Sequence, residues 1–191
     1  MEKFNIKDIK DNFVSFKTLG DGSCLLHSLL FCFNKTYRKS NVSERLKISR
    51  DLRNNLSKVL KEENKITKKT YYEELSRGDI GNISKEIPQM RLKYMEKFLL
   101  SNNWLDIFYL ELISNQLDLD IYIINSDGSF YQLGDKEIFY KNRRSVIVKY
   151  IDQAHFEAVG LVINNKKVET LFNPEFSLIK KLKEKLKMKK V

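Results

Sequence analysis

One segment of the chain places a nucleophile, a flexible loop and a helix directly after one another. Residues 20–28 read Gly-Asp-Gly-Ser-Cys-Leu-Leu-His-Ser, so Cys24 follows a glycine-punctuated loop and precedes an apolar run with helical spacing. Unpaired N–H groups and the helix dipole at a helix N-terminus favour a thiolate over a thiol. The glycines let the loop bend tightly, so that N–H groups between Asp21 and Cys24 can approach a reacting carbonyl. Cys24 is therefore a candidate nucleophile.

A thiol nucleophile needs a base, and the sequence contains two histidines. His155 lies in Ala-His-Phe-Glu-Ala, with Glu157 two residues later; in a strand these two side chains point to the same side. A loop cysteine, a distant histidine and a nearby carboxylate are the parts of a cysteine hydrolase. We therefore expect His155 to be the base and Glu157 to orient it, with Asp21 as a competing carboxylate. We expect His27 to be mainly structural, or to line the cleft from the exposed side of the helix.

Each of these residues also has a purely structural interpretation. A cysteine before an apolar helix is often a small core residue, which fits Cys32 between two phenylalanines. A histidine such as His155, between a polar loop and a strand, can be a hydrogen-bonded structural residue. The combination of the Cys24 loop with the His155 segment favours chemistry. The spacing of the two cysteines and two histidines matches no zinc module, so we expect neither a metal nor a cofactor.

The composition bounds the class of protein and its surroundings. With 191 residues, 42% of them hydrophobic, the chain fits a single domain with a real core. Its two cysteines would lie about 12 Å apart on one helix, so they form no disulfide, and we expect a reducing compartment, the cytoplasm or the nucleus. The N-terminal residues do not resemble a signal peptide, and no apolar run is long enough to span a membrane.

The basic charge is concentrated at one end of the chain. The formal net charge is +10, and residues 180–191 hold seven lysines against Glu184 alone. We therefore expect a domain over residues 1–175 and a lysine-rich helix or tail over residues 176–191. This segment is expected to be a solvated helix over a small apolar strip, or to contact an anionic membrane surface or nucleic acid.

The order of the expected elements indicates an α+β fold. Residues 1–12 are expected to form a loose lead-in or a short helix, and residues 13–16 a short strand. Apolar spacing predicts helices over residues 24–33, 43–63, 71–75 and 90–99, and another that Trp104 opens. Strands are expected over residues 119–124, 130–133, 145–150, 156–163 and 167–169, with turns at Asp127-Gly128 and Asn164-Asn165.

Three blocks of the sequence, in this order, resemble the ovarian tumour (OTU) domain cysteine proteases, which are deubiquitinases. The blocks are Asp21-Gly22-Ser23-Cys24-Leu25, then Trp104 with Glu111-Leu112 and residues 119–124, then His155-Phe156-Glu157. The resemblance covers roughly residues 13–163. The sequence departs from the family after Trp104, where the family usually has small residues, and at Glu157, where Asn or Asp is commoner.

The resemblance implies a papain-like fold with Cys24 at the start of a buried central helix, and a helical N-terminal half packed on a mainly C-terminal twisted β-sheet. It implies a monomeric thiol-dependent isopeptidase, without a cofactor, that cleaves after the C-terminal Gly-Gly of ubiquitin, polyubiquitin or a ubiquitin-like protein. Asp21 belongs to the active site by this resemblance. Two other classes stay open: an inactive OTU-like module that only binds ubiquitin, and a basic nucleic-acid-binding protein, which the confinement of the charge to the tail disfavours. The composition, rich in Lys, Asn and Ile, is compatible with a virus or an intracellular pathogen, whose protein would act in the host cytoplasm.

Overall fold

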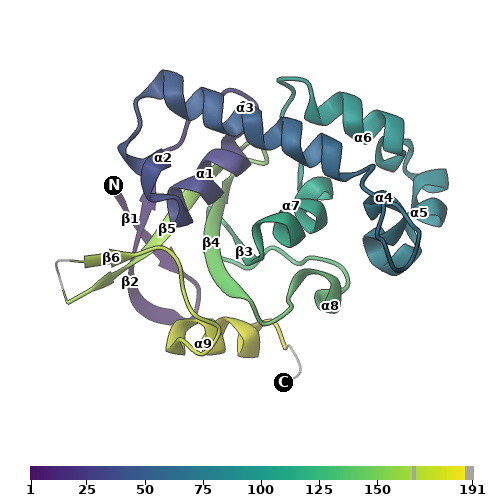
Figure 1. Cartoon of the computed structure of the whole chain (residues 1–191). Helices are drawn as coiled ribbons and strands as arrows, with labels where there is room; N and C mark the ends of the chain where they lie inside the picture. Colours follow the sequence, from purple (N-terminus) through teal and green to yellow (C-terminus); the bar gives the residue numbers. More distant parts are fainter. Residues whose placement is uncertain (165–166, 188–191) are drawn as a thin grey trace.

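A computed structural model describes residues 1–164 and 167–187, in which one mixed sheet lies between helices (Figure 1). The strands are β1 (Glu2–Ile6), β2 (Ile9–Phe16), β3 (Leu119–Asn125), β4 (Arg144–Ile151), β5 (His155–Ile163) and β6 (Lys167–Glu169). The α-helices are α1 (Cys24–Phe33), α2 (Lys35–Lys39), α3 (Val42–Val59), α4 (Tyr71–Glu74), α5 (Ile80–Glu86), α6 (Leu92–Leu99), α7 (Leu110–Leu117), α8 (Lys136–Phe139) and α9 (Ser177–Lys185). Short 3₁₀ helices are η1 (Leu75–Gly78), η2 (Pro88–Met90) and η3 (Ile107–Tyr109).

The sheet contains strands from the N-terminal and the C-terminal parts of the chain. Its strand order is β1-β2-β5-β4-β3, with β6 paired to β5. Strands β3 and β4 run parallel, and the other pairs are antiparallel. The expected α+β fold is therefore confirmed, as are the helices that begin near Cys24 and Val42 and the buried strand β3. None of the helices in the described residues combines the length and apolar character that crossing a membrane requires.

The N-terminal segment differs from our expectation. Residues 1–12 form β1 and the first half of β2, not a loose lead-in or a helix. Phe4, Ile6 and Ile9 are buried while the residues beside them are exposed, which is the period of a half-buried strand. This alternation is short and lies among charged residues, and β2 is held by pairing with β5 almost 150 residues later. The N-terminal half is therefore not purely helical.

Helix α1 forms the centre of the larger core. It is buried on nearly every side, between one face of the sheet and helix α3 (Figure 1). The expected buried central helix is therefore confirmed. A helix that is apolar all round needs protein contacts on every face, and this fixes the position of its first residue, Cys24.

Helix α9 covers the opposite face of the sheet (Figure 1). Its apolar residues Leu178, Ile179 and Leu182 are fully buried, while Lys181 and Lys185 face outward and pair with acids of the β1–β2 hairpin. The described part of the lysine-rich segment therefore belongs to the folded core. The boundary at residue 176 stays a prediction, and residues 188–191 lie outside the described residues.

Two further expected elements take another form. Trp104 opens no helix: it lies in a loop, and η3 begins only after Asp106, whose side chain accepts a hydrogen bond from the Ile107 N–H. Beyond the turn at Asp127-Gly128, a single bridge between Ile124 and Phe130 replaces the expected strand over residues 130–133. The expected turn at Asn164-Asn165 lies partly outside the described residues.

Candidate active site

Cys24 is the first residue of α1 and is only 1% exposed. Burial raises the pKa of its thiol, while the backbone of Phe156, the indole of Trp104 and the backbone of Leu25 act in the opposite direction. The net shift is upward, so the resting protein favours the neutral thiol, whereas the helix terminus alone favours a thiolate. The reason is that desolvation of the charged form outweighs the nearby N–H groups.

The segment from residue 20 to residue 24, which ends at the first residue of α1, is named here the Cys loop. Gly22 has φ +87°, and a Cβ atom there would lie 2.1 Å from the carbonyl oxygen of Asn102. Asp21 Oδ1 accepts a hydrogen bond from the Ser23 N–H (3.0 Å), which is an Asx-type bond that shapes the loop. The Ser23 N–H is therefore occupied, and within the described part of the chain the N–H groups of Gly22 and Cys24 have no protein partner. These two N–H groups can bind an oxyanion.

His27 supports the Cys loop from inside the protein. Its side chain is 0% exposed, so it does not lie on the exposed side of α1 and does not line a cleft. Its Nε2–H donates to Asp21 Oδ1 (3.0 Å), and its Nδ1 accepts from the Tyr37 hydroxyl (2.7 Å). Burial lowers the pKa of His27, with Asp21 opposing, so the ring is neutral. His27 thereby fixes Asp21, which in turn fixes the Ser23 amide.

His155 begins β5, the strand that runs beside α1. Its Nε2 lies 3.4 Å from Thr18 Oγ1, and Thr18 donates its own proton to the Phe156 carbonyl (2.5 Å). Since that proton is used, Thr18 Oγ1 accepts from Nε2–H, which leaves Nδ1 free to take a proton. Among the described residues no hydrogen bond joins His155 to Cys24, but the backbone of the next residue, Phe156, is close enough to the Cys24 thiol to lower its pKa. The structure therefore brings the two residues to the same place without a direct bond.

Glu157 is 4% exposed and does not bond to His155. Strand β5 begins at His155, as a meeting of the two side chains requires. However, the carboxylate has no hydrogen bond in the described residues, and its ionic partner is Lys149, with Nζ 4.0 Å from Oε2. Lys149 is the residue opposite Glu157 in the β4–β5 register. The orienting role of Glu157 is therefore still a prediction.

Aromatic side chains pack beside Cys24. Trp104 stacks on Tyr150 and Phe156 with ring centroids 6.3 Å from each, and Tyr150 and Phe156 stack at 4.6 Å. Trp104 therefore has a packing role. In addition, its buried Nε1 has no hydrogen-bond partner in the described residues, and the indole is close enough to the Cys24 thiol to lower its pKa.

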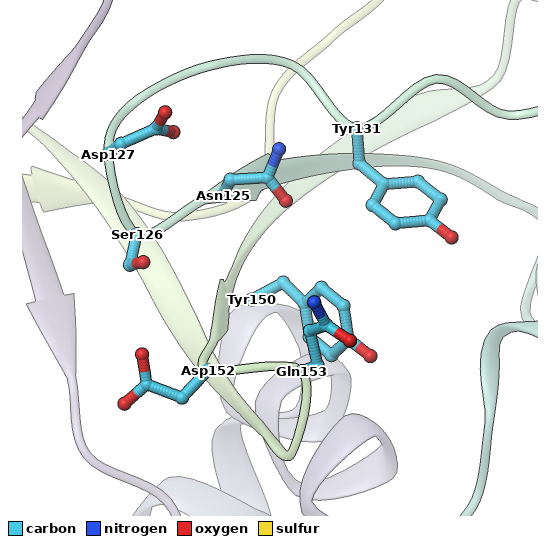
Figure 2. Close-up of a pocket in the computed structure, with 7 residues that line it drawn as sticks. All are labelled: Asn125, Ser126, Asp127, Tyr131, Tyr150, Asp152 and Gln153. Carbon is cyan, nitrogen blue, oxygen red and sulfur yellow. The ribbon is translucent and has the colours of Figure 1, made fainter.

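An open hollow of about 650 Å³ lies at the far end of this stack, and Figure 2 shows the residues that line it. It lies between the loop after β3 and the β4–β5 turn that leads to His155, and Cys24 and His155 do not line it. Tyr150 and Tyr131 form one side of the hollow, edge to face at 5.8 Å. Its lining residues are Asn125, Ser126, Asp127, Tyr131, Tyr150, Asp152 and Gln153.

Two residues near the nucleophile give no signal in the sequence. Thr18 lies within hydrogen-bond distance of His155, although 137 residues separate them in the sequence. Arg53, on α3, donates hydrogen bonds to Gly22 and Ser23 in the Cys loop. Both are common residue types in unremarkable local surroundings, and only the packing brings them to the site. In the described residues, no group of three or more His, Cys, Asp and Glu side chains is placed to hold a metal ion.

The α+β fold, together with a thiol at the start of a buried helix and a histidine at the start of the adjacent strand, defines a protein of the cysteine-protease class. A family model described as OTU-like cysteine protease matches residues 19–156. The chain belongs to this family. The matched region contains the whole Cys loop as well as Trp104 and His155.

Solved structures show the same fold. An OTU domain in complex with ubiquitin is 16% identical, with a TM-score of 0.55 over 94% of this chain and 86% of that chain. The Hazara virus OTU bound to ubiquitin is 17% identical, with a TM-score of 0.50 over 80% of this chain and 83% of that chain. Curated protein sequences give no significant match.

Proposed function

We propose that this protein is a deubiquitinase that cleaves after the C-terminal Gly-Gly of ubiquitin or a ubiquitin-like modifier. The observation that carries this proposal is the position of Cys24 at the first turn of a buried helix. In the described residues, the N–H groups of Gly22 and Cys24 have no protein partner, and the backbone of Phe156, directly after His155, lowers the pKa of the Cys24 thiol. The two relatives solved with ubiquitin support the choice of substrate.

The reaction begins with a proton transfer, because the resting thiol is neutral. His155 accepts the Cys24 proton at Nδ1 as the thiolate attacks the carbonyl carbon of the isopeptide bond. Thr18 holds the imidazole at Nε2. The carboxylate of Glu157, which projects from the same face of β5 as His155, stabilises the imidazolium.

The N–H groups of Gly22 and Cys24 bind the oxyanion of the tetrahedral intermediate. Asp21 does not touch the substrate in this scheme, because its carboxylate is engaged by the Ser23 N–H and His27. His155 then protonates the leaving lysine amine. Water, activated by His155, hydrolyses the thioester and releases the modifier.

Incubation with a ubiquitin that carries an electrophile at its C-terminus, followed by intact-mass measurement, tests the proposal. We expect a single adduct on Cys24, which Cys24→Ala abolishes. The matched control is Cys32→Ala, which should label like the wild type, because Cys32 is fully buried and burial raises the pKa of its thiol to about 12.

An adduct on Cys32, or wild-type protein that stays unlabelled, would contradict the proposal. Unlabelled protein that still binds ubiquitin in a pulldown would favour the inactive binding module. Salt-sensitive binding to nucleic acid, with neither a ubiquitin adduct nor ubiquitin binding in the pulldown, would favour a basic nucleic-acid-binding protein.

A further inference from the structure

The buried arginine of α3 has an unusual set of partners. Arg53 is 3% exposed, and in the described part of the chain it makes no ion pair with a carboxylate. Its five N–H groups are nevertheless all used. Nε donates to Ser23 Oγ (2.9 Å), Nη1 to the carbonyls of Ser101 (2.8 Å) and Phe98 (3.3 Å), and Nη2 to the carbonyls of Gly22 (2.7 Å) and Asn103 (2.6 Å).

These bonds join two loops that are far apart in sequence. Two acceptors belong to the residues directly before Cys24, and the other three lie at the end of α6 and in the loop after it. The Leu105 N–H also donates to the Gly22 carbonyl (2.9 Å). Because the guanidinium is planar and rigid, it fixes the directions of these acceptors as well as their distances.

The peptide group between Gly22 and Ser23 is held at both of its edges. The Arg53 guanidinium donates a hydrogen bond to its carbonyl oxygen, and the Asp21 carboxylate accepts a hydrogen bond from its N–H. A peptide group is planar, so two fixed edges fix the plane and therefore the direction in which the chain enters Cys24. The N–H groups of Gly22 and Cys24, which have no partner in the described residues, belong to the peptide groups directly before and after this one in the chain.

Arg53 also brings a positive charge to the nucleophile. Burial lowers its pKa, whereas the charges of Asp21, Tyr109 and Cys24 raise it. A guanidinium stays protonated under these conditions. The attraction between Arg53 and a Cys24 thiolate works in both directions, so the buried charge favours ionisation of the thiol.

We propose that Arg53 is a positioning residue of the active site, which clamps the Cys loop onto the loop 101–103 and holds the N–H groups of Gly22 and Cys24 ready for an oxyanion. This inference rests on the proposed function for its kinetic test, because turnover is measured on a ubiquitin substrate. Its chemical test, the reactivity of Cys24, does not need that function.

The experiment compares Arg53→Lys with Arg143→Lys. Arg143 is a matched control: it is also largely buried and also makes five hydrogen bonds, to Asp120, Ser114, Asn115 and Phe139, none of them in the Cys loop. For each variant we would measure the melting temperature, kcat and KM on a fluorogenic ubiquitin C-terminal amide, and the rate of Cys24 alkylation by iodoacetamide against pH.

Both variants should lose stability, because the ammonium group of lysine cannot make all five hydrogen bonds that each guanidinium makes. Only Arg53→Lys should lower kcat, by about 10- to 100-fold with KM nearly unchanged, as expected when an oxyanion site is displaced. The lysine keeps the positive charge, so a shift of the pH profile of Cys24 alkylation to higher pH, which we expect in this variant alone, reports displacement of the Cys loop from the thiol. An equal reduction of kcat in the two variants, measured below their melting temperatures so that both are folded, would overturn the proposal.

Ser23→Ala is the second variant, in case Arg53→Lys does not fold. It removes one acceptor of Arg53, and kcat should fall several-fold; wild-type kcat would refute the clamp. If wild-type protein does not turn over ubiquitin, the proposed function fails, while the alkylation profiles still decide whether Arg53 positions Cys24.

Discussion

Replacement of Gly22 by alanine tests the geometry of the Cys loop directly. The residue has φ +87°, and the added Cβ would lie 2.1 Å from the Asn102 carbonyl oxygen, a backbone atom that cannot rotate away. A Cβ in the left-handed region costs about 1–2 kcal/mol by itself. Relief of the overlap must also weaken the bonds from Leu105 and Arg53 to the Gly22 carbonyl, each worth about 1–3 kcal/mol if a buried partner is left unpaired.

We therefore expect Gly22→Ala to lower the free energy of unfolding by about 3 kcal/mol, equivalent to about 6–12 °C in melting temperature for a chain of this size. Displacement of the Gly22 N–H should lower kcat by about 100-fold, since the loss of one oxyanion donor typically costs that much. Thermal unfolding and turnover of a fluorogenic ubiquitin substrate, below the melting temperature of the variant, measure both effects.

Gly20→Ala is the matched control in the same loop. A Cβ at Gly20 meets no atom within 4 Å, and its φ does not lie in the left-handed region. We expect its melting temperature to stay near that of the wild type, and its turnover likewise. If Gly22→Ala behaves like Gly20→Ala, the loop is not held in the way described, and the assignment of the Gly22 N–H to the oxyanion is wrong.

Three other predictions concern the base, the buried histidine and the C-terminal helix. Thr18→Val should lower kcat/KM about tenfold and more than Glu157→Gln does, because Thr18 is the residue that bonds His155; the reverse order would assign the orienting role to Glu157. The pKa of His27 is lowered by burial below its usual 6.5, so the unfolded chain takes up the proton more readily, and stability present above pH 6.5 is lost as the pH falls. Melting temperatures between neutral and acidic pH should therefore fall more steeply for the wild type than for His27→Gln, and parallel curves would exclude this role. Leu182→Ala should cost about 2–5 kcal/mol in urea unfolding, because Leu182 is fully buried under the sheet. Lys180→Gln, on the exposed side of α9, should leave stability nearly unchanged, and equal effects of the two α9 variants would mean that the helix is not part of the core.

The sequence alone determined the parts of the site that depend on local patterns. Cys24 at a helix start follows from a loop with two glycines before an apolar run, and both signals lie within about a dozen residues. The buried strand β3 and the strand that carries His155 follow from continuous apolar and β-branched residues. Such patterns are visible because backbone hydrogen bonds and side-chain periodicity act over short distances along the chain.

Tertiary structure decided which groups meet at those positions. His155 bonds Thr18 across 137 residues, and Arg53 reaches the Cys loop across 30. The same packing buries His27 and directs Glu157 toward Lys149. It also raises the pKa of Cys24, because burial removes the thiolate from water by an amount that no local sequence pattern indicates.

The N-terminal hairpin and α9 show the same division at the level of the fold. The alternation in β1 is too short and too polar to predict a strand by itself, and the lysines of α9 indicate a solvated segment. Their apolar residues are buried only when the hairpin joins the sheet and α9 packs on the face to which these hairpin residues point. The stability of each depends on surface supplied by residues far away in the chain, which only the folded structure brings together.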